Sequence, residues 1–201
     1  MPVTDIRPVK DGLRRKYRRW REQLTPEDKA RLDEAITKQV CRLWQYRHSE
    51  TLLTYVSTPI EVDTHGLIRR ALQEGKRVAV PRCVPNTRQM EFFCIHGEED
   101  LHPGAFGVLE PDPLRCQKLT DHTAGLCIVP AFSYDWQGFR LGYGKGYYDR
   151  FLSGFEGYRI GICYSTCVQQ ALPHGRYDRP VELLVTEKYL RRTAKREIRG
   201  D

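Results

Sequence analysis

The chain has 201 residues, with 33 Lys and Arg against 26 Asp and Glu, a formal net charge of +7 and a pI near 9.1. This length favours one domain over residues 1–201, with a core at about 10–190, and the basic charge favours an anionic partner without identifying it. No apolar run reaches about 18 residues and none follows the N-terminal charges, which argues against a membrane span or secretory signal and predicts a cytoplasmic protein.

The first predicted element is a strongly basic helix over residues 10–21. Apolar side chains recur there at helical spacing, and we expect their face to pack on the protein: Leu13, Tyr17, Trp20 and Leu24. Arginines occupy the remaining positions, and charge runs of this kind usually form a solvated face: Arg14, Arg15, Arg18, Arg19 and Arg21.

A second helix is indicated by a cap at Thr25 followed by Pro26 and two acids, with a buried stripe behind them: Leu32, Ile36, Val40 and Leu43. A strand over 51–57 follows. The next helix begins at 63–64 and ends at Gly75, and a strand over 77–81 comes after it.

Later segments alternate in the same way. A strand is expected over 90–95 and a structured loop over 102–113, and apolar runs predict buried strands over 125–134, 158–165 and 182–187. Strands that alternate with helices predict an α/β domain with a mostly parallel sheet. Ligands of such sheets gather at the carboxyl ends of strands, so three loops are expected to share one rim: those at 61–64, 139–149 and 177–182.

Seven cysteines are scattered along the chain without a CxxC pair: Cys41, Cys83, Cys94, Cys116, Cys127, Cys163 and Cys167. The closest two lack a second pair of ligands nearby. Reduced and mostly buried thiols are therefore expected, rather than a zinc site.

The stretch FRLGYGKGYYDRFL at 139–152 carries the strongest chemical signal. Alternating glycines free the backbone to approach a ligand, and a helix beginning near Tyr147 would direct its N–H groups at the same point, which suits a phosphate. The run matches neither the P-loop nor the dinucleotide fingerprint, and a plain glycine-rich turn also accounts for its glycines. Asp149 suits Mg²⁺ beside phosphate oxygens, or is simply an acid in a first helical turn.

Five segments together resemble the 5-formyltetrahydrofolate cyclo-ligase family: Lys10-x3-Arg14, YVSTPIEVDT (55–64), GVLEPD (107–112), IVPAFSYDWQGFRLGYGKGYYDRFL (128–152) and ELLVTE (182–187). The resemblance implies a three-layer α/β/α fold like that of sugar-phosphate isomerases and coenzyme A transferases. It also implies an enzyme that uses ATP and Mg²⁺ to close 5-formyltetrahydrofolate to 5,10-methenyltetrahydrofolate, with release of ADP and phosphate through a phosphorylated imine.

The resemblance also assigns residues. It implies ATP contacts at Lys10, Arg14, Arg140, Leu141, Gly142, Tyr143, Gly144, Lys145, Gly146, Tyr147 and Tyr148. It implies folate contacts at Val56, Glu61, Tyr143, Gly144, Lys145, Gly146 and Tyr147. Arg140 and Lys145 are the implied catalytic cations. Glu61 would accept hydrogen bonds from the pterin, although a surface acid or a helix-start acid would look the same in the sequence.

The implied metal ligands are Asp149 and Glu182. Many relatives have aspartate at both ends of a D-x3-D pattern, whereas this chain has Asp178 and then Glu182. The longer side chain leaves open direct coordination by Glu182, a contact through water, or a role for Asp178 instead.

Two other function classes remain compatible with the residues. Nucleic-acid binding would use the arginine-rich ends, but it accounts for neither Asp149 nor the EVDT segment. A nucleotide-dependent ligase or kinase with another substrate would share the fold. The expectation is a monomer that binds 5-formyltetrahydrofolate and ATP and has no nucleic-acid or membrane partner.

Overall fold

A seven-stranded sheet forms the centre of the protein, for which a computed structural model describes residues 5–104, 107–122 and 125–193. Its strands lie in the order β12-β11-β9-β6-β1-β2-β3. They are β1 (Thr51–Leu53), β2 (Arg77–Cys83), β3 (Met90–Ile95), β6 (Leu126–Val129), β9 (Tyr158–Ile162), β11 (Leu183–Val185) and β12 (Leu190–Arg192). The five central strands pair in parallel, and only β3 and β12 at the edges are antiparallel. The prediction of a mostly parallel sheet is confirmed.

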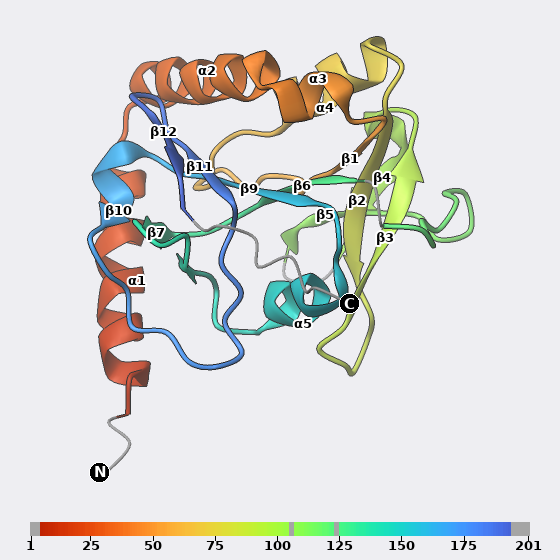
Figure 1. The fold of residues 1–201 in the computed structure, drawn as a ribbon. Coiled ribbons are helices and arrows are strands. Elements are labelled where there is room, and N and C mark those ends of the chain that lie inside the picture. The colour runs from red at the N-terminus through yellow and green to blue at the C-terminus, as the bar shows by residue number, and fades with distance from the viewer. Residues whose placement is uncertain (1–4, 105–106, 123–124, 194–201) are drawn as a thin grey trace, which may run out of the picture.

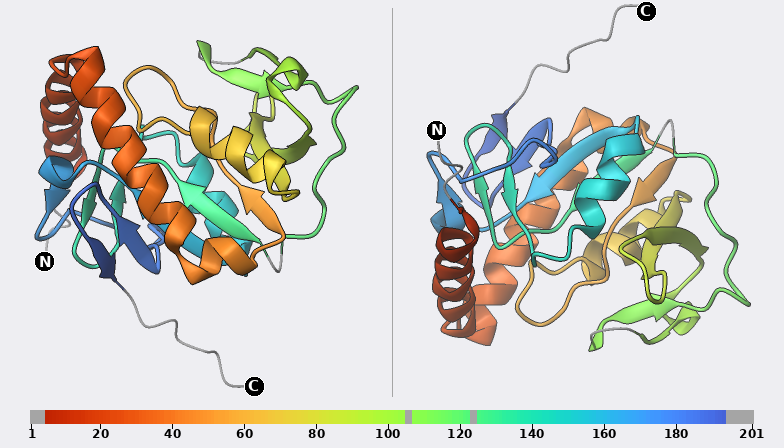
Figure 2. Two further views of the ribbon diagram at one scale, coloured as in Figure 1. Left: turned by 90° about the horizontal axis from the view of Figure 1, so that it is seen from above. Right: turned by 90° about the horizontal axis from the view of Figure 1, so that it is seen from below.

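Helices cover both faces of this sheet (Figure 1). On one face lie α2 (Pro26–Arg42), α3 (Trp44–His48) and α4 (His65–Gln73), and on the other lies α5 (Tyr147–Gly154). The N-terminal helix α1 (Arg7–Glu22) runs beside a small second sheet of β7 (Ser133–Asp135), β8 (Arg140–Leu141) and β10 (Val168–Gln169). Figure 2 shows α1 standing beyond the end of the central sheet, close to β7 and β10. The three-layer α/β arrangement is confirmed.

Local sequence signals explain several of these boundaries. The Thr25 hydroxyl accepts a hydrogen bond from the Asp28 N–H at 3.1 Å, so α2 begins where its cap and Pro26 predict. Ile36 and Val40 on that helix are buried in the core. Gly75 has φ +75°, the left-handed conformation that commonly ends helices, and α4 stops just before it.

Four predicted strands are shorter than expected, among them those over 158–165 and 182–187, which are strands only over Tyr158–Ile162 and Leu183–Val185. The strand over 51–57 ends at Leu53, because the Tyr55 hydroxyl donates to the Val62 carbonyl at 2.8 Å and the Tyr55 backbone carbonyl accepts a hydrogen bond from the Thr64 hydroxyl at 2.7 Å. These bonds fold the segment back on itself. The single strand over 125–134 is instead two strands in different sheets, β6 and β7, with Pro130 between them. Proline lacks the N–H that would continue the ladder.

The loop expected over 102–113 contains a two-stranded antiparallel ribbon of β4 (Leu101–Pro103) and β5 (Leu109–Pro111). Short 3-10 helices lie at Glu98–Asp100 and Ser165–Cys167. No helix among residues 5–104, 107–122 and 125–193 is long and apolar enough to cross a membrane.

All seven cysteines are free thiols, as expected, and five of them are buried. Burial raises the pKa of the Cys127 thiol, which lies in the middle of β6. A thiol with a raised pKa is a poor nucleophile and metal ligand, so Cys127 is a packing residue.

Candidate active site

One face of α1 connects the three loops that the sequence places near the site. Lys10, Arg14, Tyr17 and Arg21 are spaced by four, three and four residues, which puts them on a single side of a helix. The Lys10 ammonium lies 2.9 Å from the Asp178 carboxylate, and the Arg14 Nε donates to the Gly142 carbonyl at 2.8 Å. α1 therefore brings two of the predicted ATP-binding residues to two of the predicted loops.

Arg21 makes the third connection, and the expectation that it belongs to a solvated face is wrong. Its side chain is buried, and it donates to the carbonyls of Ile60, Ala131 and Phe132 at 3.2, 2.6 and 3.0 Å. These carbonyls belong to turns beyond the carboxyl ends of β1 and β6. A guanidinium carries several donors in a rigid fork, so one side chain satisfies both turns and holds them together.

The expected apolar face of α1 is therefore incomplete. Tyr17 is buried, but its hydroxyl accepts a hydrogen bond from Gln169 on β10, and Leu13, Trp20 and Leu24 are only partly buried. α1 packs through a polar stripe as well as an apolar one. The physical reason is that it faces loops and strand ends, whose carbonyls need donors, rather than the flat face of a sheet.

The glycine loop between β8 and α5 has the backbone shape that its composition predicts. Gly144 and Gly146 have φ of +87° and +74°, in the region that side chains disfavour. A Cβ atom at Gly144 would also lie 3.1 Å from Arg14 Nη2. Gly146 forms the N-cap of α5, and no side chain caps the first turn. The loop thus presents backbone next to the Arg14 guanidinium.

Arg140 lies beneath this loop rather than on its surface. It is buried, and its Nη2 donates to Asp149 Oδ1 at 2.7 Å while its Nη1 donates to the Arg179 carbonyl at 2.9 Å. The Arg179 N–H lies 3.4 Å from the same Asp149 oxygen. The start of α5 is thereby joined to the segment that leads into β11. Among the described residues, no hydrogen bond involves the other carboxylate oxygen, Asp149 Oδ2.

Residues predicted to bind folate gather on the far side of the loop. Glu61 is buried, and its Oε2 accepts the Thr58 N–H at 2.8 Å and the Thr58 hydroxyl at 2.9 Å. The ring of Tyr143 packs on Phe132 with centroids 4.6 Å apart. Partial burial and then the Glu61 charge raise the pKa of Tyr143, so its phenol stays protonated. Val56 is buried as well.

The remaining loop residues are less enclosed. Lys145 is exposed, and the Tyr147 hydroxyl donates to the Thr87 carbonyl at 3.3 Å. Burial raises the pKa of Tyr148, whose hydroxyl is buried and has no hydrogen-bond partner in the described parts of the chain. Leu141 is buried in the small sheet and can contribute only backbone to a ligand.

Asp178 and Glu182, the alternatives for a second metal carboxylate, both have cationic partners. Burial opposes ionisation of Asp178, but Lys10 and the Gly175 N–H outweigh it and the pKa of Asp178 is lowered. Both oxygens of Glu182 accept bonds from Arg159, including its backbone N–H at 2.8 Å and its Nε at 2.9 Å. Within the described ranges, no group of three or more His, Cys, Asp or Glu side chains is placed to hold a metal ion.

A comparison with known families identifies the family to which this fold belongs. The sequence pattern of the 5-formyltetrahydrofolate cyclo-ligase family matches residues 6–187, a span that includes every site residue described above. The chain belongs to the 5-formyltetrahydrofolate cyclo-ligase family. The resemblance inferred from its motifs is confirmed, and membership of this family makes the chain a ligase enzyme.

Individual members of the cyclo-ligase family are similar to this chain in sequence and in structure. A probable 5-formyltetrahydrofolate cyclo-ligase of Schizosaccharomyces pombe is 31% identical over 174 residues, covering 78% of this chain and 85% of the relative. The NMR structure of Aquifex aeolicus 5,10-methenyltetrahydrofolate synthetase matches with TM-score 0.82 and 33% identity over 96% of both chains. A 5,10-methenyltetrahydrofolate synthetase from Mycoplasma pneumoniae has TM-score 0.66 and 22% identity over 89% of this chain and 98% of its own, which supports the fold alone.

Sequence reasoning missed several residues that shape the site of this cyclo-ligase. Arg21, Thr58 and Phe132 position the groups around Glu61 and Tyr143, yet none of them stands out in the sequence. The signal for Arg21 was its spacing from Lys10 and Arg14, which places all three on one helical face. Thr58 and Phe132 act through a short turn and a ring contact, for which the sequence offers no signal.

The pairing of Glu182 with Arg159 leads to a test of the predicted metal role. We expect Glu182→Gln to lower the free energy of unfolding by about 1–3 kcal/mol, because the partly buried Arg159 loses its countercharge. Urea denaturation measures this. The Mg²⁺ concentration that gives half-maximal turnover should stay within about threefold of the original. A rise of about tenfold or more would instead establish Glu182 as a metal ligand.

Proposed function

We propose that the chain catalyses ATP- and Mg²⁺-dependent cyclisation of 5-formyltetrahydrofolate to 5,10-methenyltetrahydrofolate. In this reaction the formyl oxygen attacks the γ-phosphorus of ATP and ADP leaves, which gives a phosphorylated imine. The folate N10 then attacks the imine carbon, the C–O bond to phosphate breaks, and the N10 proton is lost. Phosphorylation is needed because oxide is a poor leaving group and phosphate a good one.

The observation that carries this proposal is the contact of Arg14 with the glycine loop. It places a cation from α1 against Gly142 and Gly144, next to the uncapped first turn of α5. Backbone N–H groups, a helix N-terminus and a guanidinium at one point are the features that bind phosphates. We therefore assign this loop to the triphosphate of ATP, with Lys10 and Lys145 at its edges.

Phosphoryl transfer depends mainly on positioning and on stabilisation of charge. Lys145, exposed on the loop, would stabilise the charge on the transferred phosphoryl group. Arg140 would act differently from the catalytic role that the resemblance implies, because its guanidinium is occupied by Asp149 and the Arg179 carbonyl. In this arrangement Arg140 orients Asp149 and anchors the loop.

The pterin would bind between Glu61 and Tyr143. Both hydrogen bonds that Thr58 donates to Glu61 go to Oε2, so the other oxygen, Oε1, is the one that would accept N–H groups of the pterin. The Tyr143 ring is 42% exposed and rests on Phe132, so it offers a face on which a flat heterocycle can stack. Arg21 fixes the turn that carries Glu61 relative to Phe132.

Asp149 is the protein group that fits Mg²⁺ best. Its Oδ1 is held by Arg140, while no hydrogen bond within the described ranges uses Oδ2. Mg²⁺ commonly takes one or two protein carboxylates and completes its shell with phosphate oxygens and water, so Asp149 alone is sufficient. When bound, the ion would neutralise charge on the β- and γ-phosphates. A contact from Glu182 would need water or release of Arg159.

Turnover of the purified chain tests the proposal. It is incubated with 5-formyltetrahydrofolate, ATP and Mg²⁺, and the methenyl product is followed by its ultraviolet absorbance. We expect product only when all three are present, and none without ATP or after treatment with EDTA. Saturable binding of ATP without product would leave a nucleotide-dependent ligase or kinase with another substrate. A monomeric state, a cytoplasmic location and the lack of a nucleic-acid partner stay predictions.

Replacement of Lys145 tests the phosphate assignment. We expect Lys145→Ala to lower kcat about 10- to 150-fold, equivalent to one charge-assisted contact of about 1.5–3 kcal/mol in the transition state. The KM for 5-formyltetrahydrofolate should change little. Steady-state kinetics measure both, with Lys16→Ala on the exposed side of α1 as the matched control. An unchanged kcat would exclude Lys145 from the reaction.

A further inference from the structure

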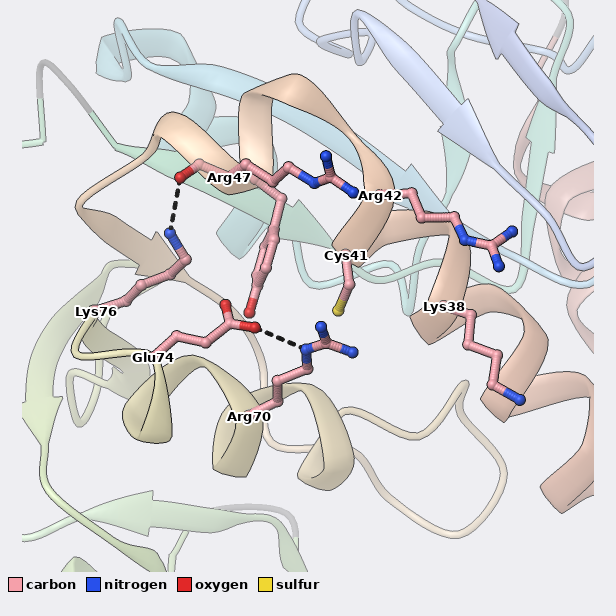
Figure 3. A pocket seen from close by; sticks show the side chains of 8 residues that line it. Lys38, Cys41, Arg42, Arg47, Arg70, Glu74 and Lys76 are labelled. Carbon is pink, nitrogen blue, oxygen red and sulfur yellow. Dashed lines mark hydrogen bonds and ion pairs between the residues drawn. The ribbon is translucent and has the colours of Figure 1, made fainter.

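A pocket lies away from the three site loops, between the last turns of α2 and α4 and the short helix α3 (Figure 3). Its volume is about 520 Å³, within the range of small-molecule sites. Lys76, at its border, immediately precedes β2, so the pocket is near the amino ends of β1 and β2. The turn that carries Glu61 follows the opposite end of β1.

The pocket is strongly basic. Five of the residues that line it are cations, and one is an acid: Lys38, Arg42, Arg47, Arg70, Lys76 and Glu74. Some of this charge is already used, because Arg70 Nε lies 2.7 Å from Glu74 Oε1 and Lys38 Nζ lies 2.7 Å from Glu34 outside the pocket. Figure 3 shows Arg70 and Glu74 pointing from α4 toward α2 and α3.

Cations are common at helix C-termini, where they satisfy the last carbonyls. Lys76 does this, since its ammonium donates to the carbonyls of Ser49 and Arg47 at 2.8 and 3.3 Å. Arg42 and Arg47 do not. Within the described parts of the chain, neither of their guanidinium groups makes a hydrogen bond or an ion pair. Helix capping therefore leaves two guanidinium groups of this pocket unexplained.

Tyr46 forms the buried wall of the pocket. It is only 1% exposed. Burial and then a hydrogen bond with Glu74 raise the pKa of this phenol, so it stays protonated. The Glu74 carboxylate therefore faces Tyr46 and Arg70, and it leaves Arg42 and Arg47 without a countercharge in the described residues.

We propose that this pocket binds a small, multiply charged anion that carries phosphate groups. Its donors come from three elements, α2, α3 and α4, and so approach from different directions. That arrangement suits the tetrahedral oxygens of a phosphate better than the plane of one carboxylate. The guanidinium groups of Arg42 and Arg47 would donate to it, while Arg70 remains within reach beside Glu74.

Titration of the full chain with pyrophosphate, in EDTA and at low salt, tests the proposal. Amide shifts in ¹H–¹⁵N spectra locate each site, so signals from residues 42–47 report on the pocket and those from 142–148 report on the glycine loop. We expect saturable shifts in the first group. The double variant Arg42→Gln/Arg47→Gln should weaken that binding at least about tenfold. Arg31→Gln, also exposed on α2 but outside the pocket, should not.

A competing anion at residues 42–47 completes the test, with circular dichroism confirming that each variant is folded. Tricarballylate, with three carboxylates, should bind there at least about tenfold more weakly than pyrophosphate. Tricarballylate binding of equal strength would overturn the phosphate assignment. Shifts confined to residues 142–148 would overturn the proposed site. Equal pyrophosphate affinities of the double variant and Arg31→Gln would overturn it too. Neither outcome would affect the expected turnover of 5-formyltetrahydrofolate.

Discussion

Asp149→Asn is expected to lower kcat about 100- to 1,000-fold while the dissociation constant for 5-formyltetrahydrofolate stays within about threefold. Asparagine keeps an oxygen that can accept the Arg140 hydrogen bond, so the loop retains its anchor. It removes the negative charge that we assign to Mg²⁺. The residues that we assign to folate, Glu61 and Tyr143, make no hydrogen bond with Asp149 among the described residues and are not altered. Stopped-flow or steady-state turnover gives kcat, and calorimetric titration gives folate affinity.

Glu34→Gln is the matched control for this substitution, because it makes the same carboxylate-to-amide change on the exposed side of α2. Its kcat should equal that of the original chain. Loss of folate affinity in Asp149→Asn to the same extent as kcat would show that the loop had collapsed, and would count against the metal assignment. A kcat within about threefold of the original would remove Asp149 from the mechanism.

Arg21→Met is expected to lower the free energy of unfolding by about 3–5 kcal/mol. Methionine fills a similar space but leaves the carbonyls of Ile60, Ala131 and Phe132 without the donor they share. Folate affinity should fall as well, because the turn that carries Glu61 loses its link to the turn after β6. Urea denaturation and calorimetric titration measure the two effects.

Arg15→Met, on the exposed side of the same helix, separates this effect from a general loss of charge or helix propensity. We expect it to change the free energy of unfolding by less than about 0.5 kcal/mol. If both variants lower the free energy of unfolding by the same amount, the buried hydrogen bonds of Arg21 do not stabilise the protein more than an exposed arginine does.

The order of helices and strands could be predicted because its signals are local. A threonine cap, a proline in a first turn and a glycine with positive φ set the ends of α2 and α4. The glycine loop was predictable for the same reason. Its alternating glycines allow a backbone that no other residue adopts easily, so composition alone indicates its shape.

Contacts between distant segments could not be predicted in this way. Glu182 meets Arg159 only because β9 and β11 are neighbours in the sheet, and Arg21 meets three carbonyls only because β1 and β6 end side by side. The sequence around a charged residue does not indicate which partner its side chain will contact. The same limit explains why Arg140, a predicted ligand of ATP, lies buried under the loop.

The contacts of helix α1 with three loops determine how substitutions can affect these loops. Because Lys10, Arg14 and Arg21 each hold a different loop, a small rotation of this one helix displaces the glycine loop, the turn that carries Glu61 and the segment before β11 together. The three loops therefore share a single mechanical support. If these loops bind ATP and 5-formyltetrahydrofolate as we propose, substitutions that tilt α1 alter the affinity for both substrates at once, whereas substitutions within one loop adjust the affinity for one substrate alone.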